Sequence, residues 1–267
     1  MYQELHKWDE TIKCAEKYKH PDVEELKKNY YSWLLETGQE EKAGEIKEEE
    51  GDYNTAINLY LKGGIPAKAA NVVYNSNVSF PADLLEKIAS NLASAGMHEK
   101  AGELYEEMDM LQKALDCYVK GNAYKKAVDL AKNAEPRLVT SLEERWGNYL
   151  MSIKQTQAAI NHYIKAEKIQ KAIEASILAR EWNKAIQLLA HQTPEVARPY
   201  YRQIAKHFAS IRQYDFAEKY YLKAGLAVDA FEMYAQAAKW EHALRLAKEN
   251  LPDSEINNLY VKQAKKF

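Results

Sequence analysis

The sequence predicts an all-α solenoid, a stack of helical hairpins, and three observations support this class. Equivalent residues recur at intervals of 58, as in Ala43, Ala101, Ala159 and Ala217. Inside each unit of 58, the same small residue recurs at offsets of thirteen. The alternation of apolar and polar residues that marks a β-strand does not persist from unit to unit. Self-similarity at a fixed period is typical of proteins whose repeats pack mainly on their neighbours.

The unit 79–136 shows how the helices are expected to follow one another. Pro81 opens a longer first helix, because proline suits the first turn, and Gly96 ends it. A second helix is expected from about His98 to Glu107, a third ends at Gly121, and a fourth follows it. Each unit is therefore predicted to hold four helices, arranged as one long and one short hairpin.

The period divides the chain into full and partial units. The full units are 21–78, 79–136, 137–194 and 195–252. A partial unit, 1–20, precedes them, and another, 253–267, follows them. Natural solenoids end in polar capping repeats, and neither end of this chain resembles one. We therefore expect the chain to be a single solenoid segment excised from a longer protein.

Twelve alanines are the predicted structural repeat anchors, because a small residue at a helix crossing lets two helices approach to about 8–10 Å. They are Ala43, Ala56, Ala69, Ala101, Ala114, Ala127, Ala159, Ala172, Ala185, Ala217, Ala230 and Ala243. A larger side chain at such a position would overpack the crossing, at a cost of about 1–3 kcal/mol.

Composition argues against several classes of function. The chain has 37 Lys and Arg against 39 Asp and Glu, so it lacks the basic excess expected for nucleic-acid binding. No apolar run has the length of a transmembrane segment. The two cysteines and seven histidines show no metal-ligand spacing, and no catalytic motif is recognisable. We predict a protein that is not an enzyme and that needs no cofactor and no metal.

Tyrosine is abundant, with 19 copies, and it recurs in columns of the repeat. Tyr60, Tyr118 and Tyr234 share one column. A column of tyrosines could line a binding groove or could pack between helices with each hydroxyl group at a polar edge. Repetition in unit after unit favours packing, because binding energy usually concentrates in a few residues.

The partner-binding residues are unknown from the sequence, and the candidate that it offers is Trp33. This residue shares its column with Asn91, Tyr149 and His207, whose polarity varies, so we expect Trp33 to be partly exposed. An exposed tryptophan is a frequent anchor in protein interfaces. Trp146 lies in an apolar column and is predicted to belong to the core.

The stretch Gly51-Asp52-Tyr53-Asn54-Thr55-Ala56-Ile57-Asn58-Leu59-Tyr60 resembles the second helix of the tetratricopeptide repeat, although that repeat has a period of about 34 residues. The alternating hairpins, with segments such as Ala158-Ala159-Ile160-Asn161-His162-Tyr163-Ile164, are similar to the solenoids of the large intraflagellar transport subunits. The similarity is to the family of the largest subunit of complex B, in which WD-repeat propellers precede a long solenoid.

The resemblance carries expectations about fold and function. It implies a tetratricopeptide-like solenoid wound as a right-handed superhelix. It also implies a protein-interaction scaffold of intraflagellar transport, needed for cilium assembly and for the transport of ciliary cargo. Its partners would be other intraflagellar transport subunits and possible cargo proteins. Its location would be the cytoplasm and the cilium, at the axoneme or the basal body.

Other functions stay open at this point. Vesicle-coat scaffolds use similar chains, and a tetratricopeptide adaptor would need a basic, polar cluster that converges on one rung. An enzyme would need a polar constellation that breaks the repeat pattern inside a pocket. For a scaffold, the fold analogy directs attention to the exposed faces of the long first helices. These faces lie near Leu26–Thr37, Leu84–Ala95, Leu142–Lys154 and Tyr200–Arg212.

Overall fold

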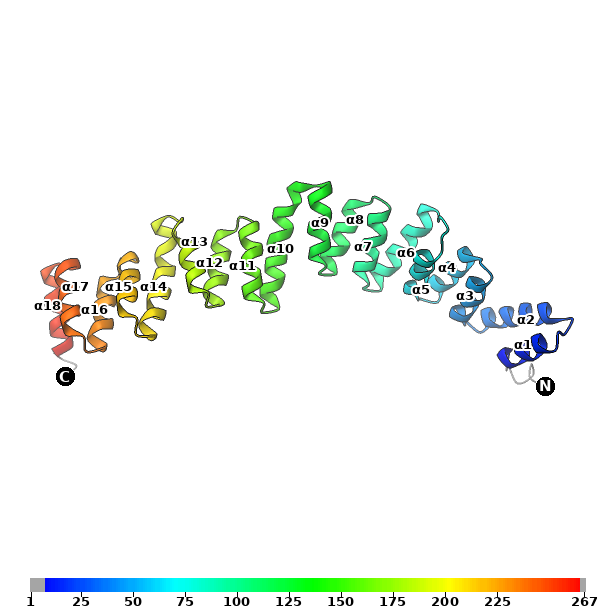
Figure 1. Ribbon diagram of the computed structural model, residues 1–267, viewed down its shortest axis with the longest axis horizontal. Helices are drawn as coiled ribbons and strands as arrows, with labels where there is room; N and C mark the ends of the chain where they lie inside the picture. The colour runs from blue at the N-terminus through cyan, green and yellow to red at the C-terminus, as the bar shows by residue number, and fades with distance from the viewer. Residues whose placement is uncertain (1–7, 265–267) are drawn as a thin grey trace. The chain divides into compact units, whose positions relative to one another are not determined.

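The computed structural model describes residues 8–264, which contain eighteen α-helices, one short 3-10 helix and no strand (Figure 1). The predicted all-α class is therefore confirmed. The parts of the predicted partial units at 1–7 and 265–267 lie outside the described residues. The handedness of the predicted superhelix stays a prediction.

Each predicted full unit carries four α-helices, and the first is the longest. Helix α1 (Trp8–Lys17) precedes them. The unit 21–78 contains α2 (Val23–Glu36), α3 (Glu40–Glu49), α4 (Tyr53–Lys62) and α5 (Pro66–Asn75). The unit 79–136 contains α6 (Ala82–Ser94), α7 (His98–Glu107), α8 (Leu111–Lys120) and α9 (Tyr124–Ala134). The second helix expected from His98 to Glu107 is confirmed.

The two remaining units follow the same plan. The unit 137–194 begins in the 3-10 helix η1 (Pro136–Leu138) and contains α10 (Val139–Ser152), α11 (Thr156–Lys165), α12 (Ile169–Leu178) and α13 (Trp182–Leu189). The unit 195–252 contains α14 (Pro194–Ser210) except for its first residue, and it contains α15 (Tyr214–Lys223), α16 (Ala227–Gln236) and α17 (Trp240–Asn250). Helix α18 (Asp253–Ala264) comes last.

By its internal contacts the chain forms two compact bodies. We call Met1–Leu142 the N-terminal body and Glu143–Phe267 the C-terminal body. Within each body, sequential helices pack against each other, and they alternate in direction (Figure 1). Most are about ten residues long, which is too short for stability in water alone, so the packing between neighbours must stabilise them.

Local signals explain where the helices begin and end. The Asp52 side chain accepts a hydrogen bond from the backbone N–H of Thr55 and so caps α4. Many helices end in a residue of left-handed conformation, which lets the chain turn back and pair the last carbonyl groups. At the end of α6, Gly96 has φ +79°, and the next N–H, of Met97, donates to the carbonyl of Leu92 at 2.9 Å.

The core of each body is built from the repeated small residues and from larger side chains beside them. All twelve predicted anchor alanines have 0% exposed surface. Tyr60, Tyr118 and Tyr234 are also among the largest fully buried side chains. Small residues at the crossings allow close helix packing, and the tyrosine rings fill the space beside them. Whether the alanines set the stability of the stack stays a prediction.

Candidate interaction surfaces

The Trp33 side chain is half-buried in an aromatic cluster. Its ring centroid lies 6.1 Å from that of Trp8 on α1 and 6.2 Å from that of Tyr30 on α2. The cluster packs against buried Leu34 and Ala43. Trp33 therefore presents part of its indole ring to solvent while its neighbours hold the ring in place. A pre-ordered tryptophan of this kind loses little conformational freedom on binding.

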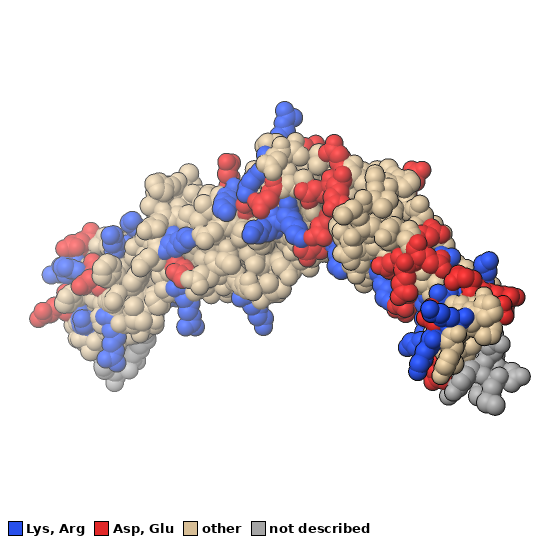
Figure 2. Space-filling model, turned by 45° about the vertical axis from the view of Figure 1, so that its right-hand side comes forward, with Lys and Arg blue, Asp and Glu red and all other residues tan. Residues whose placement is uncertain are grey.

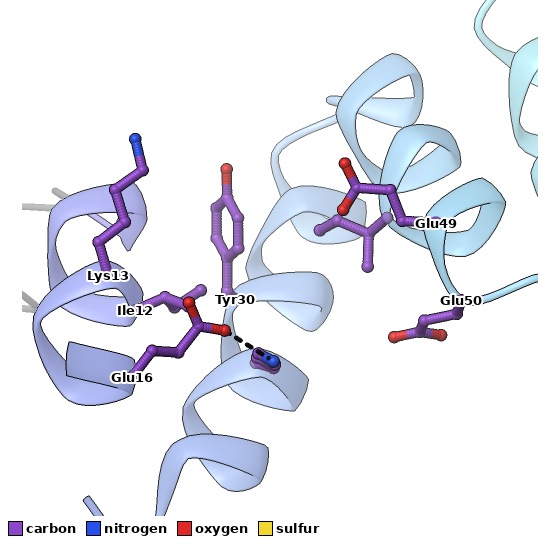
Figure 3. Close-up of a pocket in the computed structure, with 8 residues that line it drawn as sticks. Ile12, Lys13, Glu16, Tyr30, Glu49 and Glu50 are labelled. Carbon is purple, nitrogen blue, oxygen red and sulfur yellow. Dashed lines mark ion pairs between the residues drawn. The ribbon is translucent and has the colours of Figure 1, made fainter. Parts of the chain in front are cut away.

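A cavity of about 450 Å³ lies beside this cluster, among α1, α2 and α3 (Figure 3). Ile12, Tyr30 and Ile46 supply its apolar lining. The charged residues around it are Lys13, Glu16, Lys27, Glu49 and Glu50. A cavity with an apolar lining and a charged rim can receive an apolar side chain of a partner protein.

The charged rim of this cavity is largely paired. Lys27 Nζ lies 2.9 Å from a carboxylate oxygen of Glu16, the pair drawn as a dashed line in Figure 3. The hydrogen bond to Glu16 raises the pKa of the Lys27 ammonium group. Glu50 pairs with Lys47 at 2.6 Å. The rim therefore offers no strong charge preference.

The cavity was not predicted, yet the repeat columns carry a signal for it. The positions of Glu16, Lys27 and Glu50 correspond, 58 residues later, to larger or apolar side chains. These are Tyr74, Leu85 and Met108. Charged side chains thus replace apolar ones at the first occurrence of the pattern, which explains why the space stays open there.

Trp146 packs against the core cluster that contains Leu150 and Ala159, as predicted, although its side chain is only half-buried. Its ring centroid lies 3.9 Å from that of His162, and the His162 Nδ1 lies 2.6 Å from a carboxylate oxygen of Glu143. Glu143 is only 2% exposed. The imidazole and the carboxylate satisfy each other, and the indole ring covers the imidazole at the surface. The column of Trp146 is apolar elsewhere and does not reveal this polar neighbour.

Glu143 and His162 break the repeat pattern, and Lys165 Nζ lies 3.8 Å from the other carboxylate oxygen of Glu143. Among residues 8–264, no group of three or more His, Cys, Asp and Glu side chains could hold a metal ion. Both cysteines are free thiols. No helix within that range is long and apolar enough to span a membrane.

Charge is distributed unevenly between the two bodies. The N-terminal body contains 18 Lys and Arg against 25 Asp and Glu, a net charge of −7. The C-terminal body contains 19 against 14, a net charge of +5. Figure 2 shows acidic side chains gathered over the N-terminal body. The near-neutral total of the whole chain is therefore the sum of two bodies of opposite net charge.

Ion pairs between helices recur with the repeat, and one of them is inverted. Lys113 pairs with Glu86, and Lys171 pairs with Glu144 in the equivalent positions of the next unit. One unit further, the pair is Asp229 with Arg202 at 3.3 Å, with the charges exchanged. The exchange keeps opposite charges facing each other across the helix interface.

The comparisons with known proteins point in one direction. No protein-family model matches the chain. It is 47% identical over 268 residues to the intraflagellar transport protein 172 homologue of Danio rerio, a match that covers 100% of this chain and 15% of the relative. Intraflagellar transport protein 172 of Chlamydomonas reinhardtii is 46% identical with the same coverage. Intraflagellar transport protein osm-1 of Caenorhabditis elegans is 40% identical, over 93% of this chain and 14% of the relative.

These matches confirm the resemblance to the large intraflagellar transport subunits. They also define its extent, because the chain spans about 15% of the length of the relatives that it matches.

Proposed function

Because the chain matches one segment of the intraflagellar transport protein 172 family over its full length, we propose that it is a protein-interaction scaffold of intraflagellar transport. The full-length similarity at 46–47% identity is the observation that supports this proposal. As a scaffold it would bind partners without chemical catalysis, would serve cilium assembly and cargo transport, and would be found in the cytoplasm and the cilium. Its partners would be other transport subunits and their cargo.

The stacked helical hairpins suit a protein that binds partners along its length. Stacked hairpins expose one side of many helices, so a long partner can make modest contacts along several repeats. Summed over repeats, such contacts give stable binding without a deep site, since each additional contact acts at high effective concentration. The half-buried Trp33 and the cavity lined by Ile12, Tyr30 and Ile46 form the best-defined contact point on the N-terminal body.

Affinity capture with this chain as bait, in extract from ciliated cells, tests the proposal. Mass spectrometry should identify intraflagellar transport subunits above the level seen with an Ala114→Leu bait of disturbed packing. Recovery of vesicle-coat subunits in their place would support the coat-scaffold alternative. A Trp33→Ala bait tests the contact point, and we expect it to lose at least one captured subunit while it keeps its helical content.

Replacement of the segment inside the full-length protein gives an independent test. Cells that carry the full-length protein with several exposed residues of α2 and α6 reversed in charge should form short or absent cilia. Matched reversals at exposed sites of the C-terminal body, such as Lys248→Glu and Glu249→Lys, should leave cilia normal. Normal cilia in both cases would contradict a scaffold function for the long helices.

A further inference from the structure

One edge of the C-terminal body has an unusual set of turn residues. Helices α10, α12, α14 and α16 run in the same direction, so their last turns lie along one edge of the stack (Figure 1). A basic residue of left-handed conformation lies two positions after the end of each of the first three helices. These residues are Lys154 with φ +63°, Arg180 with φ +59° and Arg212 with φ +61°.

The same columns hold mostly glycine in the N-terminal body. Lys154 and Arg212 correspond to Gly38 and Gly96, which also have positive φ. Arg180 corresponds to Gly64 and Asn122. Glycine adopts this conformation without steric cost, whereas a side chain crowds the neighbouring carbonyl group. The turn needs no basic residue to form, so the fold does not explain three basic residues at three strained positions.

An exposed aliphatic side chain accompanies each of these basic residues. Ile153 is 43% exposed, Leu178 is 65% exposed and Ile211 is 47% exposed. The equivalent positions of the N-terminal body hold smaller or charged residues, namely Thr37, Lys62, Ala95 and Lys120. The combination of an exposed aliphatic group with a cation is therefore specific to this edge of the C-terminal body.

The three cations have no ion-pair partner among residues 8–264, although Glu181 and Asp215 lie near in sequence. The Glu181 side chain accepts a hydrogen bond from Gln157, and Asp215 accepts one from the Tyr234 hydroxyl group. Some basic residues of the same body are paired, as Lys171 is with Glu144 and Arg245 is with Glu218. Figure 2 shows Lys and Arg side chains that project from this lower edge of the C-terminal body.

We propose that this edge docks an acidic amphipathic helix of a partner protein. We define the basic edge as Ile153, Lys154, Leu178, Arg180, Ile211 and Arg212. Aliphatic groups would pack on the apolar side of the incoming helix, and the unpaired cations would meet its carboxylates. This inference rests on the proposed scaffold function and specifies one of its contact surfaces.

The spacing of the basic edge fits a helix better than a lipid surface. The three turns belong to every second helix, and helices pack about 8–10 Å apart, so the outer two turns are separated by up to about 35 Å. A helix that rises 1.5 Å per residue covers this distance in about 23 residues. A lipid surface would need a continuous apolar face, whereas these aliphatic groups stand singly.

Fluorescence anisotropy with two labelled helical peptides tests the proposal on the intact chain. Both peptides have about 23 residues with leucine along one face, and the opposite face carries glutamate in one and lysine in the other. We expect the glutamate peptide to bind at least about tenfold more tightly than the lysine peptide at low salt. Added salt should weaken its binding, because the contacts are exposed.

The matched variants place glycine at turn positions whose equivalents in the N-terminal body are mostly glycine. The first variant combines Lys154→Gly, Arg180→Gly and Arg212→Gly. It should keep the fold, since glycine suits these turns. It should bind the glutamate peptide at least about tenfold more weakly than the unaltered chain does. The control variant combines Lys62→Ala, Lys113→Ala and Lys120→Ala, which remove the same amount of positive charge from the N-terminal body. It should leave the affinity for the glutamate peptide unchanged. A third variant, Ile153→Ser with Leu178→Ser and Ile211→Ser, should weaken binding while it leaves the cations in place.

Three results would overturn the proposal. They are equal affinity for the two peptides, equal affinity of the glycine variant and the unaltered chain, and binding to phosphatidylserine vesicles without binding to the glutamate peptide. If the chain captures transport subunits but does not bind the glutamate peptide, the basic edge proposal has failed and the scaffold function still stands.

Discussion

The ring of Tyr118 on α8 lies directly over Gly102 on α7, so closely that a Cβ atom built on this glycine would lie 2.6 Å from a ring carbon. The Tyr118 hydroxyl group donates a hydrogen bond of 2.5 Å to the carboxylate of Glu106 on the same α7. Tyr60 lies over Gly44, and Tyr163 over Gly147, in the same way. The absence of a side chain on one helix thus creates the place for a ring on the next.

The unit 137–194 reverses the sizes in this relationship. Ile160 stands in the column of Gly102, and Ser176 stands in the column of Tyr118. Both are essentially fully buried. A large residue on the first helix is therefore matched by a small one on the second, as close packing requires.

Gly102→Ala should destabilise the chain by about 1–3 kcal/mol, because the new methyl group overlaps the Tyr118 ring. Urea denaturation followed by circular dichroism measures this change. Gly102→Ile combined with Tyr118→Ser copies the pair of the next unit and should be more stable than Gly102→Ile alone. If the second substitution gave no recovery, the two positions would not be coupled as described.

Ala114→Leu should destabilise the chain by about 1–3 kcal/mol, because Ala114 is fully buried at a helix crossing. Lys113→Leu places the same side chain one residue earlier, at an exposed site, and should have a much smaller effect. Thermal unfolding of both variants checks the difference. Equal melting temperatures would refute the anchor role predicted for the repeated alanines.

The chain should lose stability in alkaline solution because of its buried tyrosines. Burial first, and then the hydrogen bond to Glu106, raises the pKa of Tyr118, and similar causes raise the pKa values of Tyr60 and Tyr234. Below the ordinary tyrosine pKa of about 10, both states keep the proton and this stability is fully present. Above it the unfolded chain releases protons that the folded chain retains, so the free energy of unfolding falls.

Urea titrations at several values between about pH 8 and pH 11 measure this loss. Tyr118→Phe removes one such proton, so its stability should fall less steeply with pH than that of the unaltered chain. Phenylalanine at exposed Tyr18 is the matched control and should leave the slope unchanged. Parallel curves for the Tyr118 variant and the unaltered chain would contradict the assignment.

Arg212→Gly should raise the free energy of unfolding by about 1 kcal/mol, because glycine removes the crowding at a positive φ. The reciprocal change, Gly96→Arg in the same column, should lower it by a similar amount. No heavy atom lies within 4 Å of a Cβ atom built on Gly96, so backbone conformation alone is tested there. Opposite signs for the two variants in chemical denaturation are the expected result.

Glu86→Arg should lower stability, because it places two cations together at the position of the Lys113 ion pair. Combining it with Lys113→Asp reproduces the inverted pair of Arg202 and Asp229, so the double variant should recover what the single variant loses. A double-mutant cycle measures the coupling. Zero coupling would show that this exposed pair contributes nothing measurable to stability.

The sequence alone determined the repeat, the all-α class and helix limits such as those of α7. It could do so because each repeat meets an equivalent neighbour, so a position that faces a helix crossing keeps a small residue in every unit. The twelve alanines all prove to be fully buried for this reason. Trp33 was expected to be partly exposed, and its half-buried state agrees with the variable polarity of its column.

Only the tertiary structure decided which side chains meet across helices. Three features of the structure join residues 12 or more positions apart. They are the pairing of Glu143 with His162, the cavity beside Trp33 and the contact of Tyr118 with Gly102. Such contacts depend on the rotation and separation of packed helices, which a single column does not encode. The basic edge likewise depends on the tertiary structure, because the stacking of alternate helices brings its three left-handed basic residues to one side of the stack.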